Sequence, residues 1–204
     1  KIKSVKIDKS NVDFVKVFVK QQKNEIKLDL IYTIFSDGNI TVKMDFDAPE
    51  TLPNLIKVGM TMGISADYKQ TTYYGNGPWE TYPDRKRGAT IDEYQFKTDD
   101  LFYNYVMPQE SGNRTDTRWV KFTTPNEKSG LMISAATPFG FSAAPYSIKN
   151  IEKAKHPFDL KNQGFYTVHL NLIQMGVNGT LSELLPKYEV KSGKYSFEVS
   201  LKAM

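Results

Sequence analysis

Cysteine is absent from this chain of 204 residues. Without cysteine there can be no disulfide framework, no thiolate metal site and no cysteine nucleophile. Disulfides are common in the bacterial periplasm and rare in the cytoplasm, but a chain without cysteine suits either place. The absence therefore excludes three kinds of chemistry and leaves the compartment open.

Long apolar runs and blocks of one charge are also missing. No apolar stretch approaches the length of a membrane span, and the amino terminus, KIKSVKIDKS, lacks the apolar segment of a signal peptide. The net charge is +4, but 27 basic residues are interspersed with 23 acidic ones. These patterns argue against a membrane protein and against a nucleic-acid-binding protein.

The chain instead contains apolar residues in the alternation typical of strands. Hydrophobic residues make up 40% and aromatic residues 13%, enough for a substantial core. Apolar side chains alternate on both sides of Asp37-Gly38, which predicts a hairpin because Asp-Gly favours a tight turn. Further alternating segments occupy residues 12–20, 55–64, 118–124, 165–172 and 194–202.

One short helix is expected at residues 147–155. Ser147 is a candidate N-cap, apolar side chains follow at helical spacing, and Pro157 lies just beyond. No repeat, low-complexity tract or linker divides the chain. The residue pattern therefore predicts a single all-β domain, a sandwich with long functional loops and one short helix.

The stretch YYGNGPWETYPDRKRGA, residues 73–89, has neither helical nor strand periodicity and allows two interpretations. In the first it is a rigid loop, in which glycine and proline set the backbone while Trp79 and Tyr82 pin the loop to the sheet. In the second it is a sugar site, because aromatic rings can cover the apolar face of a pyranose. Residue types favour the rigid loop.

Charged side chains in the same stretch fit both interpretations. Glu80, Asp84 and Arg85 could hydrogen-bond the hydroxyls of a sugar. Because Asp84 and Arg85 are adjacent, the rigid-loop interpretation expects them to form a buried pair that holds the loop in place.

A second dense stretch, MPQESGNRTDTRWVKF at residues 107–122, has the same character. A retaining glycosidase needs two carboxylates about 5 Å apart, and Glu80 and Glu110 are the candidates. The preferred alternative is a structural network, in which the acids of both stretches pair with Arg85, Arg114 and Arg118.

The two histidines do not indicate a metal or catalytic centre. His156 and His169 lie far apart in the sequence and lack metal-ligand spacing or companion ligands. No nucleophile elbow, phosphate loop or dinucleotide fingerprint occurs. We therefore predict no metal site and no cofactor.

Four motifs, in this order, resemble the small-chain or C-terminal domain of bacterial β-galactosidases of glycoside hydrolase family two. They are YYGNGPWETYPDR, PQESGNRTDTRWV, FSAAPYSIKNIEKAKHPFDL and QMGVNG, and the resemblance is dense from Leu52 to Gly179. It implies a large antiparallel supersandwich of the galactose mutarotase kind. This expectation agrees with the strand pattern.

The resemblance also bears on catalysis. In this family both catalytic glutamates belong to a separate (β/α)₈ barrel that precedes this domain, which implies that Glu80 and Glu110 are not a catalytic pair. The domain is expected to pack beside the barrel and to close part of the rim for a β-galactoside, while being inactive alone. The resemblance implies no cofactor in this fragment and leaves a homo-oligomeric parent open. The rigid corner of the domain would consist of Trp79, Glu80, Tyr82, Asp84, Arg85, Glu110 and Arg114.

The resemblance further suggests substrate-binding residues. In this family an aromatic residue shortly before the MG motif commonly stacks on sugar, and counting back from Met175-Gly176 this position falls on Thr167. Alternation places Phe165, Thr167 and His169 on one face of a strand and Tyr166 on the other. Either the stacking platform is lost, or a small register difference lets Tyr166 or Phe165 supply it.

Two further departures from the family pattern concern the rim and the start of the domain. After the MG motif the family usually continues with two acids, Ser and Trp, whereas this chain has Thr180, Leu181, Ser182 and Glu183, so the preferred sugar stays open.

The acidic, Asn-containing loop that opens the domain is missing and the first residue is Lys1. We expect one domain over residues 1–204, an excised or processed piece without its first strands and its barrel.

Two alternatives to a β-galactosidase fragment stay open. One is a free-standing carbohydrate-binding module. The other is an aldose 1-epimerase, which needs a general acid and a general base in one concave pocket. His156 and His169 lack the sequence context of a mutarotase, so the epimerase ranks last.

Overall fold

Antiparallel strands dominate the computed structural model, which describes residues 1–177 and 183–204. The all-β prediction is therefore confirmed. The strands are β1 (Ile2–Asp8), β2 (Phe14–Lys23), β3 (Ile26–Phe35), β4 (Ile40–Asp47), β5 (Lys57–Ser65), β6 (Gln70–Gly77), β7 (Thr90–Lys97), β8 (Arg114–Thr123), β9 (Gly130–Ala144), β10 (Phe165–Gln174) and β11 (Lys194–Ala203). Short 3₁₀-helices occupy Thr98–Leu101, Pro157–Asp159 and Pro186–Tyr188.

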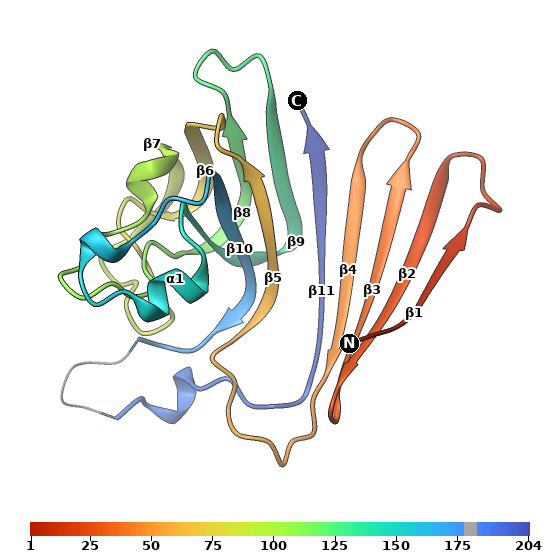
Figure 1. The fold of residues 1–204 in the computed structure, drawn as a ribbon, viewed down its shortest axis with the longest axis horizontal. Helices are drawn as coiled ribbons and strands as arrows, with labels where there is room; N and C mark the ends of the chain where they lie inside the picture. The colour runs from red at the N-terminus through yellow and green to blue at the C-terminus, as the bar shows by residue number, and fades with distance from the viewer. Residues whose placement is uncertain (178–182) are drawn as a thin grey trace.

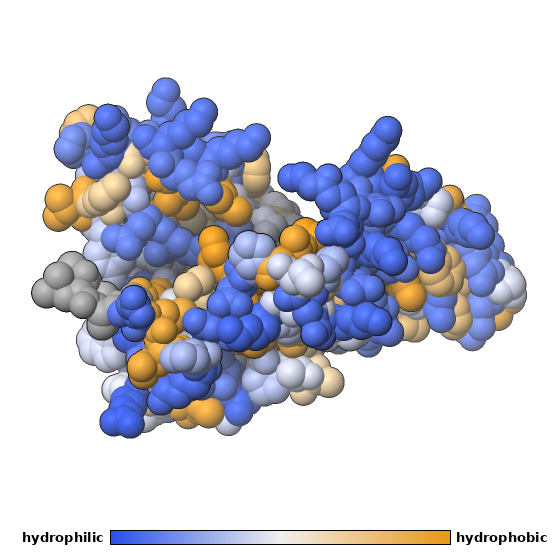
Figure 2. Space-filling view, turned by 90° about the horizontal axis from the view of Figure 1, so that it is seen from below, coloured by the Kyte–Doolittle hydropathy of each residue, from blue (hydrophilic) through white to orange (hydrophobic). Residues whose placement is uncertain are grey.

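The strands form one continuous sheet that folds over at β9. Nine of them follow the order β1-β2-β3-β4-β11-β9-β8-β6-β7, and β10 and β5 branch off from β9. The first part of β9, residues 131–134, pairs with β11, whereas its last part, residues 140–144, pairs with β10. Figure 1 shows β1 to β4 fanning out from this junction, and Figure 2 shows the same side as an arm narrower than the body of the molecule.

The predicted hairpin is present as β3 and β4. Gly38 adopts a positive φ of 83° in its turn, and the Phe35 amide donates to the Asn39 carbonyl over 2.9 Å. Residues opposite each other in an antiparallel pair point to the same face. The register pairs Tyr32 with Val42, so the hairpin presents one apolar face toward the interior.

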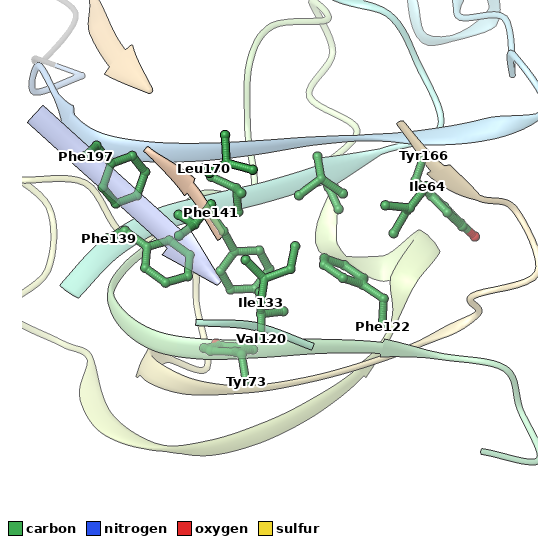
Figure 3. Close-up of a cluster of buried hydrophobic side chains, with 14 of the residues drawn as sticks. Ile64, Tyr73, Val120, Phe122, Ile133, Phe139, Phe141, Tyr166, Leu170 and Phe197 are labelled. Carbon is green, nitrogen blue, oxygen red and sulfur yellow. The ribbon is translucent and has the colours of Figure 1, made fainter. Parts of the chain in front are cut away.

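Aromatic residues fill the space between the two layers. Figure 3 shows Phe122 and Tyr73 from one layer facing Phe141 and Leu170 of the strands across from them. The ring of Phe141 meets Tyr73 edge-on at 5.1 Å and Phe122 at 6.3 Å between centroids. Successive side chains of β9 and β10 point alternately into the core and toward the outer face of the sheet.

The start of the stretch 73–89 does not form a loop, contrary to the prediction. Residues 73–77 are not loop but the end of β6, which pairs with β7 and β8. Gly75 hides the strand pattern because it offers no side chain, and a Cβ there would lie 2.8 Å from the Thr117 Cα. Strand glycines of this kind mark close backbone approach.

The predicted helix is confirmed as α1 (Ile148–Lys153), shorter than expected at both ends. The Ser147 hydroxyl accepts a hydrogen bond from the Asn150 amide over 3.2 Å, which makes Ser147 the N-cap. Ala154 already has extended backbone angles and ends the helix. Within the described ranges, no helix has the length and apolar content needed to span a membrane.

We predict that Phe141→Ala lowers the free energy of unfolding by about 3–5 kcal/mol, because it removes a fully buried ring from the middle of the core. The control is Phe158→Ala, since the Phe158 ring is largely exposed. Urea unfolding followed by circular dichroism measures both. Equal losses in the two variants would contradict this description of the core.

Candidate functional site

A buried carboxylate anchors the loop that follows β6. Glu80 Oε2 accepts from the Gly112 amide over 2.8 Å and from the Tyr82 hydroxyl over 3.4 Å, and the Tyr105 hydroxyl donates to Oε1. Arg85 Nη1 lies 3.2 Å from Oε1. The predicted pairing of Glu80 with an arginine is therefore confirmed, with Arg85 as the partner.

Gly112 can reach this carboxylate because it has no side chain. Its φ is +78°, and a Cβ at this position would lie 2.0 Å from the Leu101 carbonyl oxygen. The left-handed conformation aims the Gly112 amide at Glu80 and joins the stretches 73–89 and 107–122.

The expected pair of Asp84 with Arg85 is wrong. Arg85 turns to Glu80, and Asp84 Oδ1 accepts instead from the Val177 amide over 3.0 Å. A Cβ on Gly176 would lie 2.5 Å from Asp84 Oδ2, so the glycine makes room for this carboxylate. Asp84 thus ties the loop to the turn of the MG motif. Thr180, Leu181 and Ser182 of the family comparison lie outside the described residues.

Trp79 does not pin the loop to the sheet, contrary to the prediction. Its side chain is 63% exposed, whereas Tyr82 is 2% exposed and supplies the anchor. Pro78 and Trp79 lie in a bend after β6, and Glu80, the next residue, turns inward to meet Gly112. Burial and the nearby carboxylates of Glu80 and Glu110 raise the pKa of the Tyr82 hydroxyl.

Arg114 is fully buried without an acidic partner among the described residues. Its Nε donates to the Tyr73 hydroxyl over 3.1 Å and its Nη1 to the Gly112 carbonyl over 3.0 Å. The guanidinium also lies 5.6 Å and 5.8 Å from the ring centroids of Phe96 and Tyr103. Aromatic faces and carbonyls therefore replace the acid–arginine pair that the sequence predicted.

The remaining acids of the second stretch pair with lysines rather than arginines. Glu110 Oε2 lies 2.8 Å from Lys57 Nζ, and Gln174 Nε2 donates to Oε1 over 3.1 Å. Asp116 pairs with Lys86 over 2.9 Å. The network is structural, as expected, but its basic partners were wrong for both acids.

The four predicted substrate-binding residues lie on β10, and alternation divides them as expected. Thr167 and His169 are nearly buried on the outer face, and Phe165 is 43% exposed near the end of the strand. Tyr166 points into the core with 1% exposure, donates to Asp99 over 2.7 Å and accepts from Lys69 over 2.8 Å. Tyr166 therefore cannot provide a stacking platform, and Phe165 is the remaining aromatic candidate.

His169 is held in an uncharged state. Burial and, to a smaller extent, the Lys57 ammonium lower its pKa to about 4, with Glu110 opposing the shift. Its Nδ1 lies 3.0 Å from Thr61 Oγ1, and the two atoms share a hydrogen bond. In the described part of the chain no group of three or more His, Asp or Glu side chains could hold a metal ion.

We predict that Glu80→Ala lowers the free energy of unfolding by about 3 kcal/mol, because the Gly112 amide and the Tyr82 hydroxyl lose a charged acceptor. Glu93→Ala, at an exposed position on β7, is the matched control. Chemical denaturation of both variants gives the comparison. A loss below about 1 kcal/mol in Glu80→Ala would mean that the carboxylate is not an anchor.

We predict a pH-dependent stability that His169 controls. An unfolded histidine has a pKa of about 6.5, so between this pH and about 4 the unfolded chain binds more protons, and stability falls as the pH decreases through this window. The contribution is about 3 kcal/mol and changes no further below pH 4. Unfolding measured at several pH values should show a shallower pH dependence of the free energy of unfolding in His169→Gln than in the unmodified chain. Identical slopes in His169→Gln and the unmodified chain would contradict the burial of a neutral imidazole.

Comparison with known proteins gives matches over most of the chain. The family model described as "Beta galactosidase small chain" matches residues 1–201. A protein named beta-galactosidase from Halalkalibacterium halodurans is 36% identical over 172 residues, which are 83% of this chain and 17% of that protein. One from Priestia megaterium is 33% identical over 175 residues, 82% of this chain and 16% of that protein. The chain thus spans about one sixth of the length of these relatives.

Structural neighbours have the galactose mutarotase-like fold. A GalM/aldose epimerase homologue from C. elegans covers 98% of this chain and 68% of its own, with 9% identity and a TM-score of 0.47, a likeness too distant for a conclusion on activity. The family model and the identities of the relatives agree with the four motifs. The chain belongs to the β-galactosidase small-chain family.

Proposed function

We propose that this chain is a single scaffold and rim domain of a retaining β-galactosidase, which hydrolyses terminal β-galactosides. The observation that carries the proposal is the similarity to proteins named beta-galactosidase. Two of them are 36% and 33% identical to this chain in alignments that cover more than four fifths of it. The chain matches a small share of their length, so the proposal assigns the chemistry to a catalytic domain elsewhere in the longer protein.

The geometry of the two candidate acids supports this division of labour. Glu80 is buried and its two oxygens are occupied by an arginine, two hydroxyls and an amide. Glu110 is held between Lys57 and Gln174. A nucleophile and a general acid both need access to the substrate, and the buried Glu80 does not have it, so Glu80 and Glu110 cannot act as a catalytic pair.

The proposed partners are the catalytic domain and a β-galactoside. Asp84 and Gly176 hold the turn of the MG motif against the loop, and this turn would form the part of the rim that faces the sugar. Thr167 takes the position of the stacking aromatic residue but has little surface for stacking. We therefore propose that this domain contributes weakly to galactoside affinity.

We predict that the chain alone does not cleave an aryl β-galactoside. The longer polypeptide should be active with this segment and lose activity when the segment is deleted, and circular dichroism should show the chain alone to be folded. Turnover by the chain above a buffer blank, abolished by Glu110→Gln, would place the chemistry in this domain and reject the proposal.

We also predict that Thr167→Trp in the longer protein tightens the binding of a simple galactoside by roughly 0.5–1.5 kcal/mol, the additional contribution of an aromatic contact. The measurement is the inhibition constant of the galactoside, and Phe165→Ala tests the remaining aromatic candidate. An unchanged constant in Thr167→Trp with a marked weakening in Phe165→Ala would show that Phe165 is the platform.

A further inference from the structure

A cavity of about 180 Å³ lies on the outer face of β9 and β10. Ser142 and Ala144 of β9 and His169 of β10 form its floor, and Phe102 and Tyr146 form an aromatic wall. Side chains of α1 also line it, so the helix covers part of the sheet at this place. The cavity therefore lies between the helix, the sheet and the loop before β8.

Two hydrogen-bonding atoms on the floor have no partner among the residues that the structure describes. Ser142 and His169 are opposite each other in the register of β9 and β10 and share a face, although only 4% and 8% of their surfaces are exposed. Among the described residues, neither the Ser142 Oγ nor the His169 Nε2 makes a hydrogen bond, since the imidazole bonds Thr61 through Nδ1 alone.

These two atoms are not sealed off. In the described part of the chain, the Arg114 Nη2 is the single buried side-chain nitrogen or oxygen that has no partner and no contact with solvent. The Ser142 Oγ and the His169 Nε2 are therefore reachable, and the cavity is the space that both residues line. Buried polar groups normally find partners, so this pair indicates a ligand or ordered water in the cavity.

The chemistry of the lining selects the ligand. A serine hydroxyl donates and accepts, an uncharged imidazole nitrogen does one or the other, and both suit a hydroxyl group. Glu152 also lines the cavity, and its carboxylate accepts hydrogen bonds from hydroxyls but repels anions. Glu110, the other acid of the lining, is already paired with Lys57. The Phe102 ring can cover an apolar C–H face.

We propose that this cavity binds one neutral monosaccharide ring, whose hydroxyls bond the Ser142 Oγ and the His169 Nε2. Its volume equals that of about six water molecules at about 30 Å³ each, room for a single small ring. Glu110 is partly exposed and marks the side from which a ligand enters. This site goes beyond the proposed rim function, because it is complete within this chain.

The chain itself serves for the test, by titration calorimetry and by thermal unfolding with galactose, glucose and galacturonate as probes. We expect saturable binding of one neutral sugar per chain and a raised melting temperature, with weaker binding of the anionic galacturonate. Ser142→Ala should weaken the binding roughly two- to ten-fold, as for one lost hydrogen bond, without lowering the melting temperature of the free chain, because the Oγ has no protein partner. Ser134→Ala on the same strand, outside the cavity, is the matched control.

A second variant, Ala144→Leu, places a larger side chain on the cavity floor and should abolish binding. If it does not fold, Ser142→Ala decides the question. The absence of binding by every neutral sugar to the folded chain would show a cavity that holds water only, and binding that survives both variants would place the sugar elsewhere; either result overturns the proposal. Neither result affects the rim function, which is tested in the longer protein.

Discussion

One strand, β9, holds the protein together because it belongs to both layers. Its first part pairs with β11 and its last part with β10, while β8 accompanies it on the other edge. Without this strand the branch of β5 and β10 would have no hydrogen-bonded connection to the rest of the described sheet. Inner side chains such as Phe141 fill the core, and Ser142, the next residue, faces the cavity.

Polar groups are then organised around the carboxylate of Glu80. It joins the loop after β6 to the Gly112 turn before β8, and Asp84 continues the connection to the turn of the MG motif. Three segments far apart in the sequence are thus fixed relative to one another by two carboxylates. Such a corner keeps the outer face of β10 in a defined position beside the loops.

The sequence predicts those parts of the fold that depend on local patterns. The hairpin at Gly38 and the helix capped by Ser147 follow from turn chemistry and capping, and most strands follow from alternation. β6 was missed because Gly75 and Gly77 interrupt the pattern. A side chain on Gly75 would meet Thr117 of β8, and one on Gly77 would meet Tyr73 of β6 itself and Tyr94 of β7.

Partners of charged groups could not be predicted in the same way. Arg85 was expected to pair with the adjacent Asp84, but it pairs with Glu80, whose buried charge would be uncompensated without a partner. Trp79 was expected to pin the loop to the sheet, yet it lies in the bend after β6 and its side chain is exposed. The sequence motifs identified the stretches 73–89 and 107–122, whereas only the fold shows which of their side chains contact each other.

The outer face of β10 combines both kinds of information. Alternation correctly groups Thr167 with His169, but sequence gives no reason to include Ser142, which becomes their neighbour only through the register of β9. The Thr167 hydroxyl accepts a hydrogen bond from Gln163 Nε2 over 2.6 Å, whereas in the described part of the chain no residue bonds the Ser142 hydroxyl. On this face the cross-strand pair of Ser142 and His169 is therefore better placed to bind a ligand than Thr167, the position indicated by the family motif. Because buried polar groups normally find partners, a hydroxyl left without one among the described residues indicates a binding surface rather than a packing surface.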